Sequence, residues 1–185
     1  YDYVPGIYDG NVGAGYANLA YETYQFSTGI KRFDFNNSNF SRIIQCAEHL
    51  PDPKGILKGT YSNCCWQNQL MDKAVDTAIW RYMHPDFAFL LDTKFSGYPD
   101  EYVNPSNGDR FPVAPFQYIE SHDHPRFITR IAPTSVKDLL GYPYGDRSQF
   151  YRLQPYAIAL FTAQGIPMLW QGQEIGENWG LPDTG

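Results

Sequence analysis

Two segments of this chain combine carboxylates, imidazoles and aromatic rings in a pattern that could bind a ligand or catalyse a reaction. The first is Ser121-His122-Asp123-His124-Pro125, which follows the mostly apolar run Phe116–Glu120. Aromatic and β-branched residues favour a strand, and a proline helps to end one. A carboxylate at a strand end can act as a base, as a nucleophile or as a partner for ligand hydroxyls, and a neighbouring imidazole can donate to the same ligand. Taken alone, the pair His122-Asp123 is better explained as a loop cap and a turn.

The second segment is Gly165–Glu174, with the sequence GIPMLWQGQE. The glycine and the proline at its start predict a tight turn from a helix into a strand at Met168–Trp170. Gly172 allows a bend or a close approach of the backbone just after that strand. For Glu174, a role in capping a turn and a role in holding a ligand are equally compatible with the sequence.

A zinc ion is an alternative use for the two histidines of the first segment. His122 and His124 are two residues apart, but a zinc site needs three or four protein ligands. No further histidine or cysteine stands near them in the sequence. The segment therefore predicts no bound metal.

Helices and strands must alternate along the chain to position the two segments. Apolar spacing predicts helices over Tyr16–Phe26, Ser41–Leu50, Trp66–Tyr82 and Ser148–Gln164, and strands over Gly55–Thr60, Phe116–Glu120 and Met168–Trp170. Pro155 is expected in the first turn of the last helix or at a kink. Residues 1–15 and 34–41 are expected in loops, and residues 86–115 in a long ordered excursion. Because one helix links the last two strands, they are expected to be parallel neighbours.

Composition excludes several classes of protein. The 185 residues are 43% hydrophobic without a long unbroken apolar stretch, which argues against a membrane span. A net charge of −6 without a basic block argues against binding to nucleic acid or to anionic membranes. Cys46, Cys64 and Cys65 form no CxxC pair, so we expect reduced, buried thiols, which are compatible with the cytoplasm. Aromatic residues make up 17%, and tyrosine suits the apolar faces and hydroxyls of a sugar, although core packing must account for most of them.

Together, the two segments resemble two sequence motifs of the alpha-amylase superfamily of glycoside hydrolases and glucanotransferases. In that family the seventh strand of a (β/α)8 barrel ends in His-Asp, and the eighth carries Gly-x-Pro-x-x-x-x-Gly-x-Glu. Here these motifs are FQYIESHD and GIPMLWQGQE. The stretch WQNQLMD, residues 66–72, is less closely similar to the start of the sixth crossover helix in glucan branching enzymes and their trehalohydrolase and isoamylase relatives. One departure is Glu120-Ser121, where many members have Asn before the His-Asp pair.

The resemblance implies an α/β fold in which residues 1–185 form the C-terminal part of a (β/α)8 TIM barrel, about strands six to eight. It implies hydrolysis or transglycosylation of α-glucosidic bonds in starch-like or glycogen-like glucans by a retaining mechanism. By resemblance, Asp123 stabilises the transition state, and the substrate-binding residues are His122, Arg126, Trp170 and Glu174. The nucleophile and the acid/base of the family lie on strands four and five. We expect both upstream, in a missing N-terminal half of a longer protein, for which calcium remains open.

Two other functions are compatible with the same residues. An amylase-like domain can persist as a non-catalytic binding or assembly module, because a fold does not determine a function. An unrelated barrel hydrolase could instead use Asp123 and Glu174 as its acid pair. That alternative requires the two carboxylates to lie within about 5 to 10 Å of each other.

Overall fold

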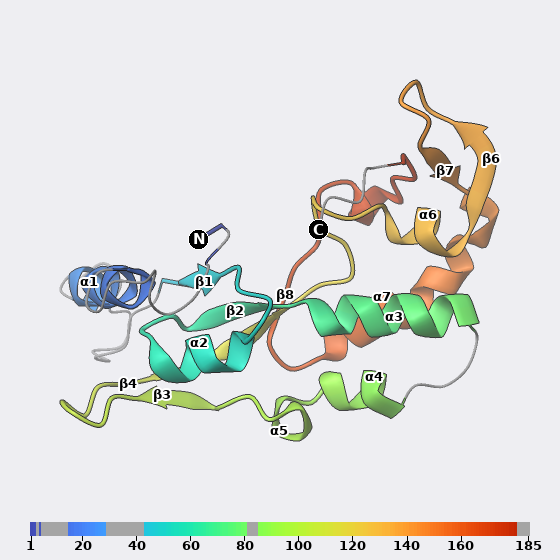
Figure 1. Cartoon of the computed structure of the whole chain (residues 1–185). Coiled ribbons are helices and arrows are strands. Elements are labelled where there is room, and N and C mark those ends of the chain that lie inside the picture. The colour runs from blue at the N-terminus through green and yellow to red at the C-terminus, as the bar shows by residue number, and fades with distance from the viewer. Residues whose placement is uncertain (3, 5–14, 29–42, 81–84, 181–185) are drawn as a thin grey trace. The chain divides into compact units, whose positions relative to one another are not determined.

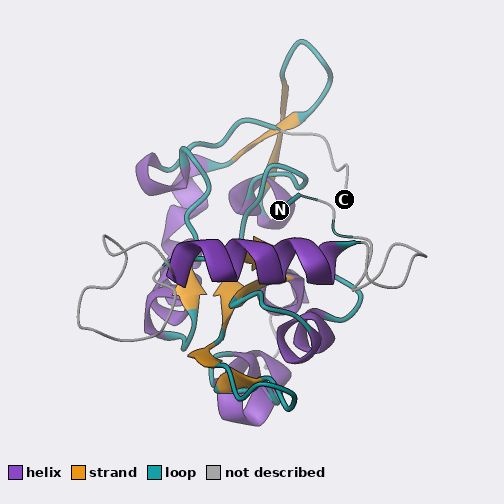
Figure 2. Ribbon diagram, turned by 90° about the vertical axis from the view of Figure 1, so that its left-hand side faces the viewer, coloured by secondary structure: helices purple, strands orange, loops and turns teal. Residues whose placement is uncertain are grey.

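The computed structural model describes residues 1–2, 4, 15–28, 43–80 and 85–180, and Figure 1 traces the chain through them. The described elements form two compact units. The first unit comprises Tyr1–Gln67 and Thr93–Phe116, and the second comprises Asn68–Asp92 and Gln117–Gly185. The loops predicted at residues 1–15 and 34–41 lie almost wholly outside the described residues. Figure 2 distinguishes the helices, strands and loops.

A four-stranded parallel sheet has the strand order β1-β2-β5-β8. The strands are β1 (Cys46–Ala47), β2 (Cys64–Gln67), β5 (Ala114–Gln117) and β8 (Ile166–Pro167). β5 begins in the first unit and its last residue, Gln117, belongs to the second. There the carbonyl of Gln117 accepts a hydrogen bond of 2.8 Å from the amide of Met168, just after β8. The prediction that the last two strands are parallel neighbours is confirmed, but their bounds differ. β5 ends at Gln117 rather than at Glu120, and β8 lies just before the predicted strand Met168–Trp170, whose residues are in no strand.

β1 lies within the range Ser41–Leu50, where the sequence predicted a helix. Residues 43–50, the described part of that range, contain β1 and no helix. The amino group of Tyr1 donates to the carbonyl of Cys46 (2.9 Å), and the amide of Glu48 donates to the carbonyl of Tyr1 (2.9 Å). This alternation is that of a parallel ladder. Because β1 is hydrogen-bonded to β2 on one side and to Tyr1 on the other, tertiary pairing overrides the helical spacing of its apolar residues.

α2 (Pro53–Gly59) occupies the place where a strand was predicted at Gly55–Thr60. The carboxylate of Asp52 caps it by accepting a hydrogen bond of 2.9 Å from the amide of Gly55, and a proline stands in the first turn. Both are features of a helix N-terminus, and they precede the apolar pair Ile56 and Leu57, which is buried. The strand prediction was wrong because a short apolar run does not by itself distinguish a buried helix from a strand.

The remaining elements of the first unit surround an aromatic core. α1 (Tyr16–Thr28) confirms the first predicted helix and extends two residues further. The predicted excursion contains the short helix α5 (Thr93–Ser96) and the antiparallel hairpin of β3 (Glu101–Val103) and β4 (Arg110–Pro112). Buried aromatic rings line this core: Tyr24, Tyr61, Tyr98, Tyr102 and Phe111. Much of the aromatic content is therefore used in packing.

The second unit is mainly helical. Its elements are α3 (Asn68–Trp80), α4 (Pro85–Leu90), α6 (Phe127–Ile131), the hairpin β6 (Pro133–Lys137) and β7 (Pro143–Gly145), the 3-10 helix η2 (Arg147–Leu153), α7 (Gln154–Thr162) and the 3-10 turn η3 (Gln173–Ile175). α3 begins two residues later than predicted because Trp66 and Gln67 belong to β2. The predicted helix Ser148–Gln164 is divided into η2 and α7, and Pro155 stands in the first turn of α7 as expected. Among the described residues, no helix combines the length and the apolar character that crossing a membrane requires.

Candidate functional site

The His122-Asp123 pair lies in the turn that follows the carboxyl end of β5. The Nε2 atom of His122 is 3.4 Å from Oδ1 of Asp123, and the side chains are 46% and 29% exposed. The amide of Asp123 donates to the hydroxyl of Ser121 (3.3 Å), which orders the turn. The pair is therefore accessible from solvent while its backbone is held, as a ligand-binding carboxylate requires.

Arg126 and Glu120 form a buried ion pair beneath this turn. Nη1 of Arg126 donates to Oε2 of Glu120 at 3.1 Å, and the side chains are only 9% and 4% exposed. Oε1 of Glu120 also accepts from the amide of Phe127 at 2.8 Å, at the start of α6. Burial raises the pKa of Glu120, and the Phe127 amide and the Arg126 guanidinium oppose that rise. Glu120 thus joins the start of the His-Asp turn to Arg126 and to the start of α6.

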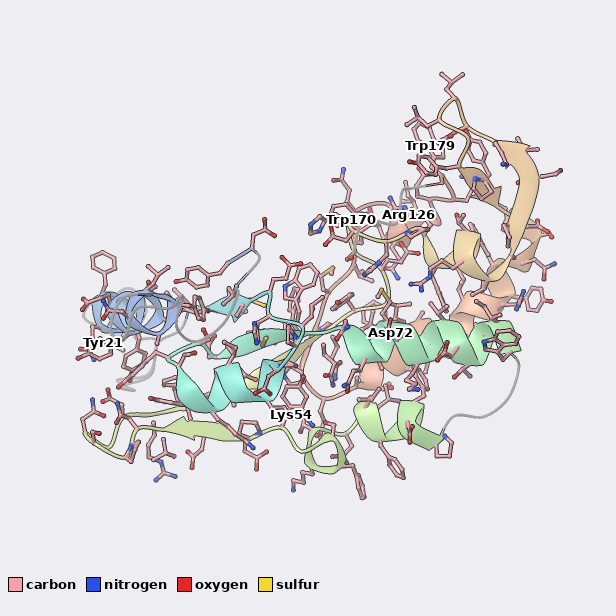
Figure 3. The ribbon with its side chains drawn as sticks, in the orientation of Figure 1. Tyr21, Lys54, Asp72, Arg126, Trp170 and Trp179 are labelled. Carbon is pink, nitrogen blue, oxygen red and sulfur yellow. The ribbon has the colours of Figure 1, made fainter. Side chains whose placement is uncertain are left out.

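Arg126 also joins the two motif segments. Its Nη2 atom donates to the carbonyl of Gln171 at 2.7 Å. The rings of His122 and Trp170 lie 5.8 Å apart between centroids. Figure 3 labels Arg126 and Trp170, one from each of these segments. The residues after β5 and the residues after β8 are therefore brought together at the carboxyl ends of neighbouring parallel strands.

Gly172 permits this close approach. Its φ of +92° is in the left-handed region, and a Cβ atom there would lie 2.9 Å from Nη2 of Arg126 and 2.9 Å from Cβ of Glu177. The carboxylate of Glu174 accepts a hydrogen bond of 2.9 Å from the amide of Gly172. Of the two roles open to Glu174 in the sequence, the structure shows the turn cap.

Asp72 and Arg130 were not identified as site residues from the sequence. Burial raises the pKa of Asp72, on α3, and the charges of Arg130 on α6 and of His124 lower it. Figure 3 shows Asp72 near the start of α3. About 50 residues separate Asp72 from His124, so only the packing of α3 against α6 reveals that the charges interact.

Glu48 is a second acidic residue that sequence analysis did not select. It directly follows β1, and the amide of Val4 donates to its carbonyl at 2.8 Å. The sequence did not suggest a strand end here because residues 41–50 were expected to form a helix. β1 therefore places a carboxylate directly after a strand within this chain.

The described residues contain no group of three or more His, Cys, Asp or Glu side chains arranged to hold a metal ion. Comparisons with protein-family models, with curated proteins and with solved structures give no match for this chain. The function is therefore argued from the chemistry of the site and from the motifs that the sequence carries.

Proposed function

We propose that this chain is part of an enzyme that hydrolyses or transfers α-glucosidic bonds of starch-like or glycogen-like glucans by a retaining mechanism, on a (β/α)8 barrel in the cytoplasm. One observation carries the proposal. The turn with His122 and Asp123 lies against the segment Trp170–Gly172, and each follows the carboxyl end of one of two neighbouring parallel strands. In barrel and open α/β folds, this end of the sheet is where substrates bind.

Asp123 would accept hydrogen bonds from hydroxyl groups of the sugar beside the reacting carbon. As the ring flattens toward an oxocarbenium ion, positive charge develops, and a fixed carboxylate stabilises that charge more than it stabilises the bound substrate. His122 would donate a hydrogen bond to the same sugar. The indole face of Trp170, beside His122, offers an apolar surface to the C–H groups of the ring.

A retaining reaction also needs a nucleophile and an acid/base. We propose Glu48 as the acid/base, because its carboxylate directly follows β1 within the first unit. The nucleophile is not assigned to any described residue, and the expectation that it lies upstream is part of the proposal.

The test compares Asp123→Asn with the wild type in the full-length protein that contains this chain. The amide keeps the shape of the side chain and loses its charge, so turnover of maltooligosaccharides should fall by about 10²-fold to 10³-fold. His122→Ala removes one donor and should cost less. Asp76→Asn is the matched control, because Asp76 is on α3 in an exposed pair with Lys73. The measurement is the initial rate of release of reducing sugar or of chain transfer, with circular dichroism to verify folding.

Near-normal turnover by Asp123→Asn would contradict the proposed role. Binding of oligosaccharide by the wild type without any turnover would favour the non-catalytic, amylase-like module. A loss in Glu174→Gln as large as that in Asp123→Asn would favour an unrelated hydrolase that uses this acid pair. Because Glu174 is bonded to the Gly172 amide, we expect Glu174→Gln to retain most of the activity.

A further inference from the structure

Cys46 and Cys64 are directly opposite each other in the β1–β2 ladder. The parallel register pairs Cys46 with Cys64 and Ala47 with Cys65. Directly paired residues of neighbouring strands project to the same face of the sheet, and successive residues project to opposite faces. Cys65 therefore points away from the pair, and its thiol donates instead to the carbonyl of His49 at 3.5 Å.

The two paired thiols contact each other. The thiol of Cys64 is hydrogen-bonded to that of Cys46, and this contact, followed by burial, raises the pKa of Cys64 above its ordinary value. Cys64 is fully buried, whereas Cys46 is partly exposed. A reagent in solution would therefore reach Cys46 first, with Cys64 already in place behind it.

We propose that Cys46 and Cys64 form an oxidisable dithiol that closes to a reversible disulfide by exchange with a small-molecule disulfide such as oxidised glutathione. The Cys46 thiolate attacks one sulfur of the small disulfide, forms a mixed disulfide and releases one thiol. The Cys64 thiolate then attacks the Cys46 sulfur and releases the second thiol. The two protein sulfurs lose two electrons, the small disulfide gains them, and the two protons of the protein thiols pass to the released thiolates. This inference goes beyond the proposed sugar chemistry and does not depend on it.

The partial exposure of Cys46 would make this disulfide reversible. Neighbouring strands lie about 4.7 to 4.9 Å apart, within the range of about 4.4 to 6.8 Å that separates the two Cα atoms of a disulfide. Closing the bond therefore needs little movement of the backbone, and disulfides with an exposed sulfur are more easily reduced than buried structural ones. The bond would also fix the position of β1, which Glu48 directly follows.

The experiment exposes the purified chain to mixtures of oxidised and reduced glutathione at neutral pH, quenches with acid and blocks the remaining thiols by alkylation. Peptide mapping by mass spectrometry then locates each modified cysteine. The wild type should lose two hydrogens and contain a Cys46–Cys64 link that excess reduced glutathione reverses. Cys65→Ala is the matched control and should form the same link. Cys64→Ala should form no link and should accumulate glutathione on Cys46, because the resolving thiol is gone.

A stable glutathione adduct on Cys46 of the wild type would overturn the inference, as would a link that involves Cys65 or two thiols that stay reduced in excess oxidised glutathione. The mapping of the wild type is decisive even if a variant fails to fold. Loss of glucan turnover does not enter this test, so its outcome and that of the proposed function are independent.

Discussion

The ionisation of Glu120, which is buried against Arg126, makes the stability of the folded chain dependent on pH. Burial raises the pKa of Glu120 above its ordinary value of 4.5, so the folded chain binds a proton on this carboxyl more tightly than the unfolded chain does. The stability that this proton binding contributes is fully present below the ordinary pKa and is lost as the pH rises through the raised pKa.

We therefore expect the wild type to lose stability relative to Glu120→Gln as the pH rises from the ordinary pKa of a glutamate toward neutral pH. The glutamine keeps an acceptor for the Phe127 amide and for Arg126 but cannot titrate. Urea unfolding of both proteins across this range gives the difference directly. A difference that stays constant, or that favours the wild type increasingly toward neutral pH, would show that the ion pair outweighs burial.

Gly172 and Gly141 form a matched pair for a second prediction at this scale. Both have a left-handed backbone, with φ of +92° and +90°, but a Cβ at Gly141 would meet nothing within 4 Å. Gly141→Ala should cost about 1 to 2 kcal/mol from backbone strain alone. Gly172→Ala should cost more, because its methyl group would also press on Arg126 and Glu177. The free energy of unfolding in urea measures both, and equal losses would mean that the loop relaxes freely around residue 172.

At the scale of elements, α2 shows how a local cap selects a helix. Asp52→Ala removes the side-chain acceptor of the Gly55 amide and should destabilise the protein by about 1 kcal/mol. Faster hydrogen exchange of the amides in residues 53–59 should accompany that loss. Lys58→Ala, an exposed change in the last turn of the same helix, leaves the cap intact and serves as the control. If both variants exchange alike, the packing of Ile56 and Leu57 alone maintains the helix.

β1, in contrast to α2, depends on tertiary partners rather than on a local sequence signal. It has only two residues, and its hydrogen bonds go to β2 and to the amino group of Tyr1, while Glu48 directly after it bonds to Tyr1 and Val4. Such a strand is stabilised by partners distant in sequence, so its own composition does not predict a strand. Both the Glu48 position and the Cys46–Cys64 pairing depend on this element.

At the scale of the whole molecule, net charge controls encounters with other polymers. A charge of −6 without a basic stretch should repel polyanions. We expect no salt-dependent binding of the chain to fluorescently labelled duplex DNA or to vesicles rich in phosphatidylserine, measured by anisotropy and by co-sedimentation. Binding that weakens steeply with added salt would reveal a cationic surface that the sequence does not suggest, because counterion release drives such a dependence.

The sequence by itself determined the elements whose signals are local. The helical spacing of α1, α3 and α7, the proline in the first turn of α7, and the turn between α7 and β8 all follow from neighbouring residues. The motif ESHD and the motif GIPMLWQGQE could be located for the same reason. The parallel pairing of β5 and β8 was also predictable, because a single helical crossover usually joins adjacent strands.

Tertiary structure alone decided what depends on partners far apart in the chain. Glu120 became a buried anchor because Arg126 reaches both it and the carbonyl of Gln171, about 45 residues away. β1 became a strand because β2 and Tyr1 supply its hydrogen bonds, which placed Glu48 at a strand end and Cys46 opposite Cys64. Backbone and charged groups must find partners once they leave water, and a linear sequence does not state which distant group will provide them.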